Sequence, residues 1–421
     1  MLIHKFTLIL LVIWLASCSN TQNLNTSQFQ AQEAEVVFDG NIENVDVRCE
    51  KLFVDPPFHF VEGMKHIDAI VAVKKKGLYA LGSAYTGKGR DGDMNLIHFD
   101  KKLKETWRKA YEENSVEWGT EIRYHEDHLY ALATRFTNGK ADNDVYVIKT
   151  DLAGEKIWSK TSGTPNYDVG NDFTIHNEQV FVSGRTVKSL IRDPFILKTD
   201  GLTDSLSIQA TKGKNIESFI EQYADSLFFV SSIFEGDERE KWLELACYDL
   251  DLNELWRHKV TDLSGDRPTG QMLITQAGDI YLMGHLGVDK YGYQILIAKV
   301  SLQGQTEWIK TYGLLNEGQS MGRIDMGQFI LESADQGVVI GGNTGSLYGS
   351  GINYLFEINE TGNPVWAKGY INPNGYLSSI SYEPTSEQYI LGGYYRQTLS
   401  SDEVSKGFLL ALDRTGEIVE K

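Results

Sequence analysis

The chain has 421 residues, with 40 lysines and arginines against 58 aspartates and glutamates, so its formal net charge at pH 7 is −18. Such an acidic chain is not expected to bind nucleic acid or an anionic membrane surface through charge. Aromatic residues make up 11% of the sequence, and 21 of them are tyrosines, a composition typical of β-rich proteins.

The first residues predict a signal peptide over 1–17. An apolar run from Phe6 to Leu15 is too short to span a bilayer. It ends in Leu15-Ala16-Ser17-Cys18, which resembles the bacterial lipobox, where cleavage leaves the cysteine at the mature N-terminus for lipidation. An ordinary signal peptide cleaved after Ala16 is the alternative.

A polar stretch over 18–39 follows and is expected to form a flexible tether. We therefore expect lipid on Cys18 to anchor the protein in the outer membrane, because Ser19 and not Asp follows the cysteine. Surface-exported lipoproteins of the Bacteroidota often carry acidic residues just after this cysteine. Here the first acidic residue is Glu33, which favours the periplasmic face over the cell surface.

The rest of the chain repeats a turn of the form Asp/Asn-x-x-Gly-x-x-x-Trp, as in Asp151 to Trp158. Successive copies begin about fifty residues apart, which indicates one supersecondary unit used repeatedly. The turn-opening residues are Asp100, Asp151, Asp200, Asp249, Ser301, Asn359 and Asp413. The tryptophans are Trp107, Trp158, Trp256, Trp308 and Trp366, with Ser207 and Glu420 at the same position in the third and seventh copies.

Each unit contains about four short strand patterns, which in the second copy cover 120–124, 128–133, 144–150 and 156–160. Fifty-residue units of four strands predict an all-β, seven-bladed β-propeller with four-stranded blades over 40–421. The blades are expected at about 66–112, 118–163, 170–212, 216–260, 268–312, 322–370 and 376–421.

The last blade ends as its outer strand should form, and an open edge strand invites aggregation. We expect residues 45–53, which alternate partly, to pair with this terminal blade; a stub over Glu417–Lys421 is the alternative. Small residues are expected to end the inner strands near the crowded axis: Gly82, Ala133, Gly184, Ser232, Gly284, Gly342 and Gly393.

The tryptophan turn resembles that of quinoprotein-like propellers, a group that includes the lipoprotein of the outer-membrane β-barrel assembly machinery. The likeness covers about 66–421 and is limited to blade pattern, since three steps and not four separate Asp151 from Gly154. The pattern is closer to repeat lipoproteins of Bacteroidota envelopes, as in Gly341-Gly342-Asn343-Thr344 and in Trp308 to Gly313. This resemblance implies a fold more than an activity.

The sequence contains no motif that assembles a catalytic site. The histidines are scattered, and neither a zinc motif nor a nucleophile elbow is found. Two stretches with clustered oxygen ligands, 90–95 and 142–144, both lack the calcium-loop pattern. We expect Cys49 and Cys247 to be buried thiols and not a disulfide. No metal or cofactor is expected, and an enzyme is less favoured than a binding protein.

The loops that follow the small residues are expected to carry the binding surface. The candidate ligand-face residues are Thr134, Arg135, Arg185, His285, Asn343, Tyr394, Tyr395 and Arg396. Mixed polar and aromatic groups are typical of interaction surfaces. The sequence thus favours a non-enzymatic, lipid-anchored platform that binds an envelope protein, with a glycan-binding or glycan-acting protein as the alternative.

Overall fold

The computed structural model describes residues 42–54, 56–85, 92–111, 116–136, 143–188, 191–208, 214–235, 240–263, 271–287, 292–315, 323–346, 349–371, 375–396 and 405–419. Contacts divide the chain into Met1–Glu33 and Ala34–Lys421, and every described residue belongs to the second unit. The predicted signal peptide, the tether over 18–39 and Cys18 lie outside the described residues.

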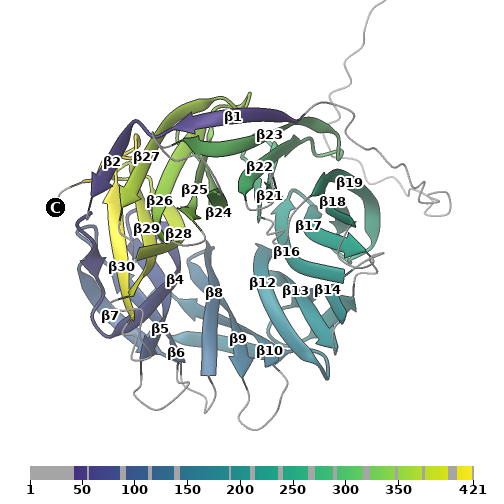
Figure 1. Ribbon diagram of the computed structural model, residues 1–421. Helices are drawn as coiled ribbons and strands as arrows, with labels where there is room; N and C mark the ends of the chain where they lie inside the picture. The colour runs from purple at the N-terminus through teal and green to yellow at the C-terminus, as the bar shows by residue number, and fades with distance from the viewer. Residues whose placement is uncertain are drawn as a thin grey trace, which may run out of the picture. The chain divides into compact units, whose positions relative to one another are not determined.

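The described residues form thirty strands arranged as seven blades around one axis (Figure 1). Blade 1 contains β4 (Met64–Val73), β5 (Gly77–Tyr85), β6 (Gly92–Phe99) and β7 (Glu105–Ala110). Blade 2 contains β8 (Val116–His125), β9 (His128–Phe136), β10 (Asn143–Asp151) and β11 (Lys156–Ser162). Blade 3 contains β12 (Tyr167–His176), β13 (Gln179–Lys188), β14 (Ile191–Thr199) and β15 (Asp204–Ile208). Blade 4 contains β16 (Lys214–Tyr223), β17 (Ser226–Glu235), β18 (Glu240–Asp249) and β19 (Glu254–Leu263).

The remaining blades also use segments from the N-terminal part of the chain. Blade 5 contains β20 (Gln271–Ile274), β21 (Ile280–Gly287), β22 (Tyr293–Val300), β23 (Thr306–Leu315) and an added β1 (Glu43–Arg48). Blade 6 contains β24 (Arg323–Glu332), β25 (Val338–Ser346), β26 (Gly349–Ile358), β27 (Pro364–Ile371) and an added β2 (Lys51–Val54). Blade 7 contains β28 (Gly375–Glu383), β29 (Gln388–Arg396), β30 (Ser405–Leu412) and β3 (His59–Phe60).

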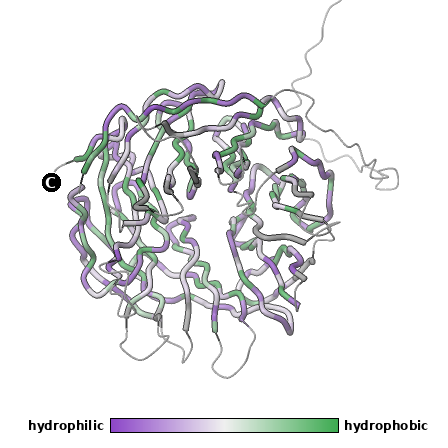
Figure 2. The backbone as a smooth tube through the Cα atoms, viewed as in Figure 1, coloured by the Kyte–Doolittle hydropathy of each residue, from purple (hydrophilic) through white to green (hydrophobic). Residues whose placement is uncertain are grey.

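These sheets confirm the predicted all-β, seven-bladed propeller. The innermost strands are β4, β8, β12, β16, β20, β24 and β28; each contacts the next, and β28 contacts β4 to close the ring. Figure 2 shows hydrophobic segments in all the blades. They form clusters shared by neighbours, such as Leu81 of blade 1 with Ile122 of blade 2. The described residues contain no helix long and apolar enough to cross a membrane.

The turn-opening residue of each repeat holds its own turn through backbone hydrogen bonds. Asp151 Oδ1 accepts bonds from the Ala153 and Glu155 N–H groups at 2.9 and 2.8 Å. Asn359 Oδ1 accepts equivalent bonds from Thr361 and Asn363. An Asp or Asn side chain in this place satisfies N–H groups that the tight turn leaves unpaired. The conserved position within the repeat is therefore explained by turn geometry.

The tryptophan of each motif packs against the turn glycine of the following blade. A β-carbon at Gly154 of blade 2 would lie 2.8 Å from the ring of Trp107 of blade 1. Gly154 also has φ +74°, which glycine adopts without strain. The same contact joins Trp158 to Gly201, Trp256 to Gly304, Trp308 to Gly362 and Trp366 to Gly416. We call this contact the Trp–Gly lock.

The two blades without this tryptophan are followed by blades without this glycine. Ser207 and Glu420 occupy the tryptophan position in blades 3 and 7, and the next turns carry Leu252 and Leu103. Both leucines keep the left-handed turn conformation, with φ values of 66° and 57°. Leu103 is buried in a cluster with Leu409 of blade 7. Where the preceding blade lacks the tryptophan, a leucine in the turn thus fills the space between the two blades.

The prediction that residues 45–53 pair with the terminal blade is wrong. β1 and β2 instead run parallel to the outer strands β23 and β27 of blades 5 and 6 (Figure 1). β3, a few residues further on, pairs with β30 and supplies the fourth strand of blade 7. The alternative stub near the C-terminus amounts, within the described residues, to one bridge between Leu412 and Ile418.

Apolar contacts explain why this N-terminal segment crosses three blades. Val47 is fully buried among side chains of blades 5 and 6, and the Phe53 ring stacks on Tyr370 at 5.6 Å. Phe58 stacks on Phe408 of blade 7 at 3.9 Å. An alternating apolar pattern fits the edge of any outer strand, so the pattern alone could not select the blade.

The small residues expected to end the innermost strands also lie elsewhere. They belong to the second strand of each blade and not to the innermost one. In six blades the described innermost strand carries one or two extra residues, a β-bulge, opposite this position. A β-carbon at Gly184 or Gly393 would lie 2.3 or 2.1 Å from the carbonyl oxygen of Val169 or Tyr376. Glycine is needed at these two positions because the bulge brings a carbonyl oxygen close to the α-carbon, whereas blades 2 and 4 accommodate Ala133 and Ser232 at the equivalent position.

The two cysteines among the described residues are not bonded to each other. The expected burial holds for Cys247 in blade 4 but not for Cys49, which is partly exposed between β1 and β2 and lies near Gly369 of blade 6. Burial raises the pKa of the Cys247 thiol to about 11. This thiol is therefore protonated and unreactive at neutral pH.

The Trp–Gly lock predicts energetic coupling between residues of adjacent blades. Gly154→Leu should destabilise the protein by clashing with Trp107, and Trp107→Ser should leave a void. The double variant should lose less than the sum of the two losses, by about 1–2 kcal/mol, because it recreates the pairing of blades 3 and 4. Denaturant unfolding of all four proteins measures this coupling.

The matched control pairs Trp107→Ser with Gly304→Leu, whose glycine contacts a different tryptophan, and its losses should add. If the Trp107–Gly154 pair is equally additive, the contact does not couple the blades.

Candidate functional site

The two ends of the ring differ. The Asp-x-x-Gly turns lie at one end. At the opposite end the innermost strands begin and the second strands finish, as the antiparallel pairing of β8 with β9 shows. We call this second end the loop face. The predicted ligand-face residues lie near it, in the last part of the second strands.

Four of these residues pair directly with a residue of the innermost strand, just before the bulge. The pairs are Thr134 with Trp118, Arg185 with Val169, Asn343 with Met326, and Tyr394 with Tyr376. The candidates are therefore strand residues next to the loop face and not loop residues. The corresponding pair in blade 1 is Ser83 with His66.

Burial removes two candidates from the surface. Thr134 is 6% exposed and His285 is 2% exposed. The Gly327 N–H group donates a hydrogen bond of 2.9 Å to His285 Nε2. His285 thus joins blade 5 to the bulge of blade 6, which is a structural role. The expectation that these two side chains stand on a ligand surface is not met, because their strands are covered by the neighbouring blade.

Three further candidates do not come together in the structure. Arg135 Nη1 donates a hydrogen bond of 2.8 Å to Thr161 Oγ1, and the guanidinium lies 4.5 Å from the Tyr146 ring centre. Asn343 Oδ1 accepts a bond of 3.5 Å from Gln328 Nε2 in blade 6. Arg185 is partly exposed in blade 3. Arg135 and Asn343 thus belong to the local packing of their own blades.

Tyr394 and Arg396 do meet, together with residues that the sequence did not indicate. The Tyr376 and Tyr394 rings stack with centroids 5.1 Å apart, and the Arg396 guanidinium lies 5.3 and 5.5 Å from them. The ring of His66 in blade 1 packs against that of Tyr394, with ring centroids 4.4 Å apart. We call Tyr376, Tyr394, Arg396, His66 and the adjacent Lys65 the blade 7–blade 1 seam. Tyr395 lies apart from it and packs against Phe60.

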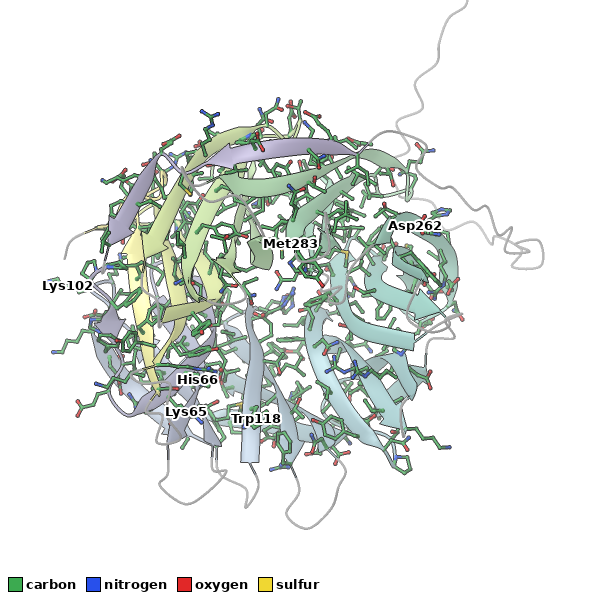
Figure 3. All side chains as sticks on the ribbon, in the orientation of Figure 1. Lys65, His66, Lys102, Trp118, Asp262 and Met283 are labelled. Atoms are coloured by element: carbon green, nitrogen blue, oxygen red, sulfur yellow. The ribbon has the colours of Figure 1, made fainter. Side chains whose placement is uncertain are left out.

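Trp118 is the most exposed large aromatic residue at the start of an innermost strand. It is 53% exposed, and its ring packs edge-on against Phe136 at 4.6 Å. Figure 3 labels it near Lys65 and His66, at the beginnings of the adjacent strands β8 and β4. No sequence signal marks this position, because only the bulge register shows that Trp118, His66 and Tyr376 are equivalent.

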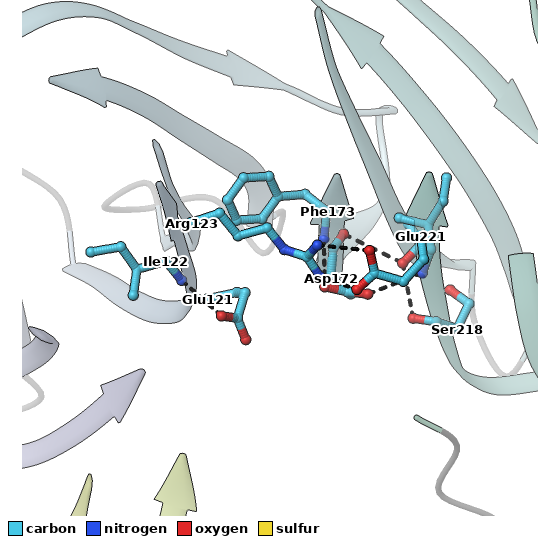
Figure 4. Close-up of polar contacts among 9 residues, drawn as sticks. Glu121, Ile122, Arg123, Asp172, Phe173, Ser218 and Glu221 are labelled. Carbon is cyan, nitrogen blue, oxygen red and sulfur yellow. Dashed lines mark hydrogen bonds and ion pairs between the residues drawn. The ribbon is translucent and has the colours of Figure 1, made fainter. Parts of the chain in front are cut away.

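A second cluster joins the innermost strands of blades 2, 3 and 4 (Figure 4). Arg123 Nη2 lies 3.0 Å from Asp172 Oδ1 and 2.7 Å from Glu221 Oε1. The Ile220 N–H group of blade 4 donates to Asp172 Oδ2 at 3.0 Å. The side chains of Arg123 and Asp172 are 27% and 9% exposed. One guanidinium therefore links three blades in a largely dehydrated place.

The charges in this cluster do not balance, because Glu121 adds a third carboxylate. Burial raises the pKa of Glu121 to about 7, although the Arg123 charge opposes the shift. Burial also raises the pKa of Asp172 to about 6. The pKa of Arg123 is raised despite burial, because Glu221 and Asp172 stabilise its charge. Glu121 thus holds a proton for part of the time at neutral pH.

Asp68, the bulge residue of blade 1, has a similar environment. Ser83 Oγ donates a hydrogen bond of 2.9 Å to it, but burial still raises its pKa to about 7. Carboxyl groups that titrate near neutrality can exchange protons with a ligand. The described residues contain no group of three or more His, Cys, Asp or Glu arranged to hold a metal ion.

The raised pKa of Glu121 predicts a pH-dependent effect of its removal. Its folded pKa lies above the unfolded value, so its stabilising effect is present below about pH 4.5 and is lost as the pH rises through about 7. Glu121→Gln, which mimics the protonated form, should raise the free energy of unfolding at pH 8 on the order of 2 kcal/mol. At pH 4, below the unfolded pKa, the variant should match the wild type.

Denaturant unfolding at the two pH values measures this difference, with Glu62→Gln at an exposed position as the control. An equal effect of Glu121→Gln at both pH values would show that folding does not raise the pKa of Glu121.

Comparisons with known proteins support the fold alone. No protein-family model matches the sequence, and no curated protein matches it. The structure is similar to a periplasmic gluconolactonase of Pseudomonas aeruginosa, with a TM-score of 0.52 and 12% identity, covering 81% of this chain and 97% of that one. It is also similar to a puromycin hydrolase, with a TM-score of 0.53 and 10% identity, covering 84% of this chain and 53% of that one. The β-propeller domain of a Pyrococcus furiosus protease matches with a TM-score of 0.48, at 11% identity over 85% of this chain and 97% of that one.

Proposed function

We propose that this chain is a non-enzymatic, lipid-anchored propeller of the bacterial outer membrane that binds an envelope protein through its loop face. The observation that supports this most is Trp118, which is 53% exposed on a rigid innermost strand. Tryptophan and tyrosine anchors supply much of the binding energy in protein interfaces. The blade framework fixes the anchor in place, so little conformational entropy is lost when a partner binds.

A second candidate function is glycan binding, and it is favoured by the blade 7–blade 1 seam. Its stacked tyrosines and guanidinium combine an apolar ring surface with hydrogen-bond donors. Such a combination suits a sugar ring and its polar substituents.

The protein-partner function predicts that Trp118→Ala strongly weakens capture of a stoichiometric partner. In-cell crosslinking followed by mass spectrometry measures this capture, with an expected loss of about tenfold or more because a central anchor contributes at least about 1.4 kcal/mol. Val365→Ala is the matched control, since Val365 is 54% exposed on an outer strand. Undiminished capture by Trp118→Ala would exclude Trp118 as the anchor.

The membrane anchor is tested by Cys18→Ser. This variant should lose incorporation of an alkyne-labelled fatty acid and leave the membrane fraction, because the thiol that would carry the lipid is removed. Proteolysis of intact cells then distinguishes the leaflets: protection supports the periplasmic face, and digestion supports the cell surface. Membrane retention of Cys18→Ser without label would contradict lipid anchoring at this residue.

A further inference from the structure

The blade 7–blade 1 seam gathers positive charge in a strongly acidic protein. The chain has a formal charge of −18, yet Lys65 of blade 1 and Arg396 of blade 7 both lie near His66, and Lys65 also lies near the Asp68 carboxyl. Burial first, and then the charges of Lys65 and Arg396, lower the pKa of His66 to about 4. His66 is therefore neutral at physiological pH, and the seam repels a further cation. A ligand that fits this potential is an anion.

The aromatic rings indicate which kind of anion fits the seam. The Tyr376 and Tyr394 rings are stacked within 17° of parallel, and Arg396 lies against both. A guanidinium stacked on aromatic rings is held in a fixed plane, and its N–H groups lie along the edge of that plane, where they match a carboxylate. Aromatic rings nearby offer a surface for the apolar face of a sugar. A small inorganic anion would use only the cations.

We infer that the seam binds an acidic sugar, a uronate or sialate residue of a glycan, through these two features together. The sugar carboxylate contacts Arg396 and Lys65, and the sugar ring lies against Tyr376, because Tyr394 is already packed between Tyr376 and His66. This inference rests on the second candidate function and is independent of the protein partner at Trp118. It adds the charge of the ligand, which glycan binding alone does not specify.

The experiment is isothermal titration of the full chain, purified in detergent, with four probes: tri-galacturonate, sialyllactose, neutral galactotriose and inorganic phosphate. We expect one of the acidic sugars to bind and galactotriose and phosphate to bind at least about tenfold more weakly. Raising the salt concentration should weaken the binding, because the seam charges are partly solvated.

Variants then locate the binding in the seam. Arg396→Ala should weaken binding of the acidic sugar about tenfold or more, since it removes a charge-assisted contact. Arg396→Lys should retain part of the affinity, and Tyr376→Ala should weaken it at any salt concentration. Lys188→Ala is the matched control: it removes an exposed cation at the corresponding end of β13 in blade 3. Thermal unfolding of each variant separates lost contacts from lost folding, and Lys65→Ala provides a second test if Arg396→Ala does not fold.

Each of the other possible results contradicts a different part of the proposal. Equal binding of galactotriose, unaffected by Arg396→Ala, would overturn the acidic ligand while leaving glycan binding intact. Binding of phosphate as tight as that of the acidic sugars would show an anion site without sugar recognition. If none of the four probes binds, both the acidic ligand and the glycan function are excluded.

Discussion

The contact between the tryptophan of one blade and the turn glycine of the next is the interaction on which the ring depends. It fixes the distance between neighbouring blades, because an indole and a β-carbon cannot share that space. Tyrosine hydroxyls reinforce it: Tyr111 donates to the Gly154 carbonyl oxygen at 2.8 Å, and Tyr370 donates to that of Gly416 at 2.7 Å. In the two pairs of blades that lack the tryptophan, Leu103 and Leu252 replace the glycine. The tryptophan of one blade and the turn glycine of the next are therefore present together or absent together.

Because contacts between the outer turns hold neighbouring blades together, the ring can accommodate β-bulges and buried charged groups near its axis. The innermost strands carry β-bulges, and the bulges place polar residues such as Asp68 where little water surrounds them. Arg123 compensates Asp172 and Glu221 across three blades, and Glu121 remains partly protonated. Paired charges in such surroundings stabilise a fold little, but removing one partner is costly. The cluster therefore fixes the relative positions of blades 2, 3 and 4.

The same bulges explain how much of the candidate site could be predicted. The sequence located Tyr394 and Arg396 correctly near one end of the ring, because they follow a small residue that recurs in every copy. It also placed Thr134 and His285 there, although both are buried by the adjacent blade. Trp118, His66 and Tyr376 were missed, since their equivalence depends on a shift of strand register. Such a shift leaves no periodic signal in a single strand.

The sequence by itself determined the all-β class, the number of blades and the turns that separate their outer strands. A period of about fifty residues carries this information locally, because each turn is closed by its own side chain, as Asp151 closes 151–155. Only the tertiary structure decided how the ring closes and which side chains meet across its seams. The N-terminal strands could add to the edge of any blade, and the burial of Val47 and the ring packing of Phe53 and Phe58 selected blades 5, 6 and 7. Contacts between residues some three hundred positions apart, such as His66 and Tyr394, arise from that closure and from nothing local.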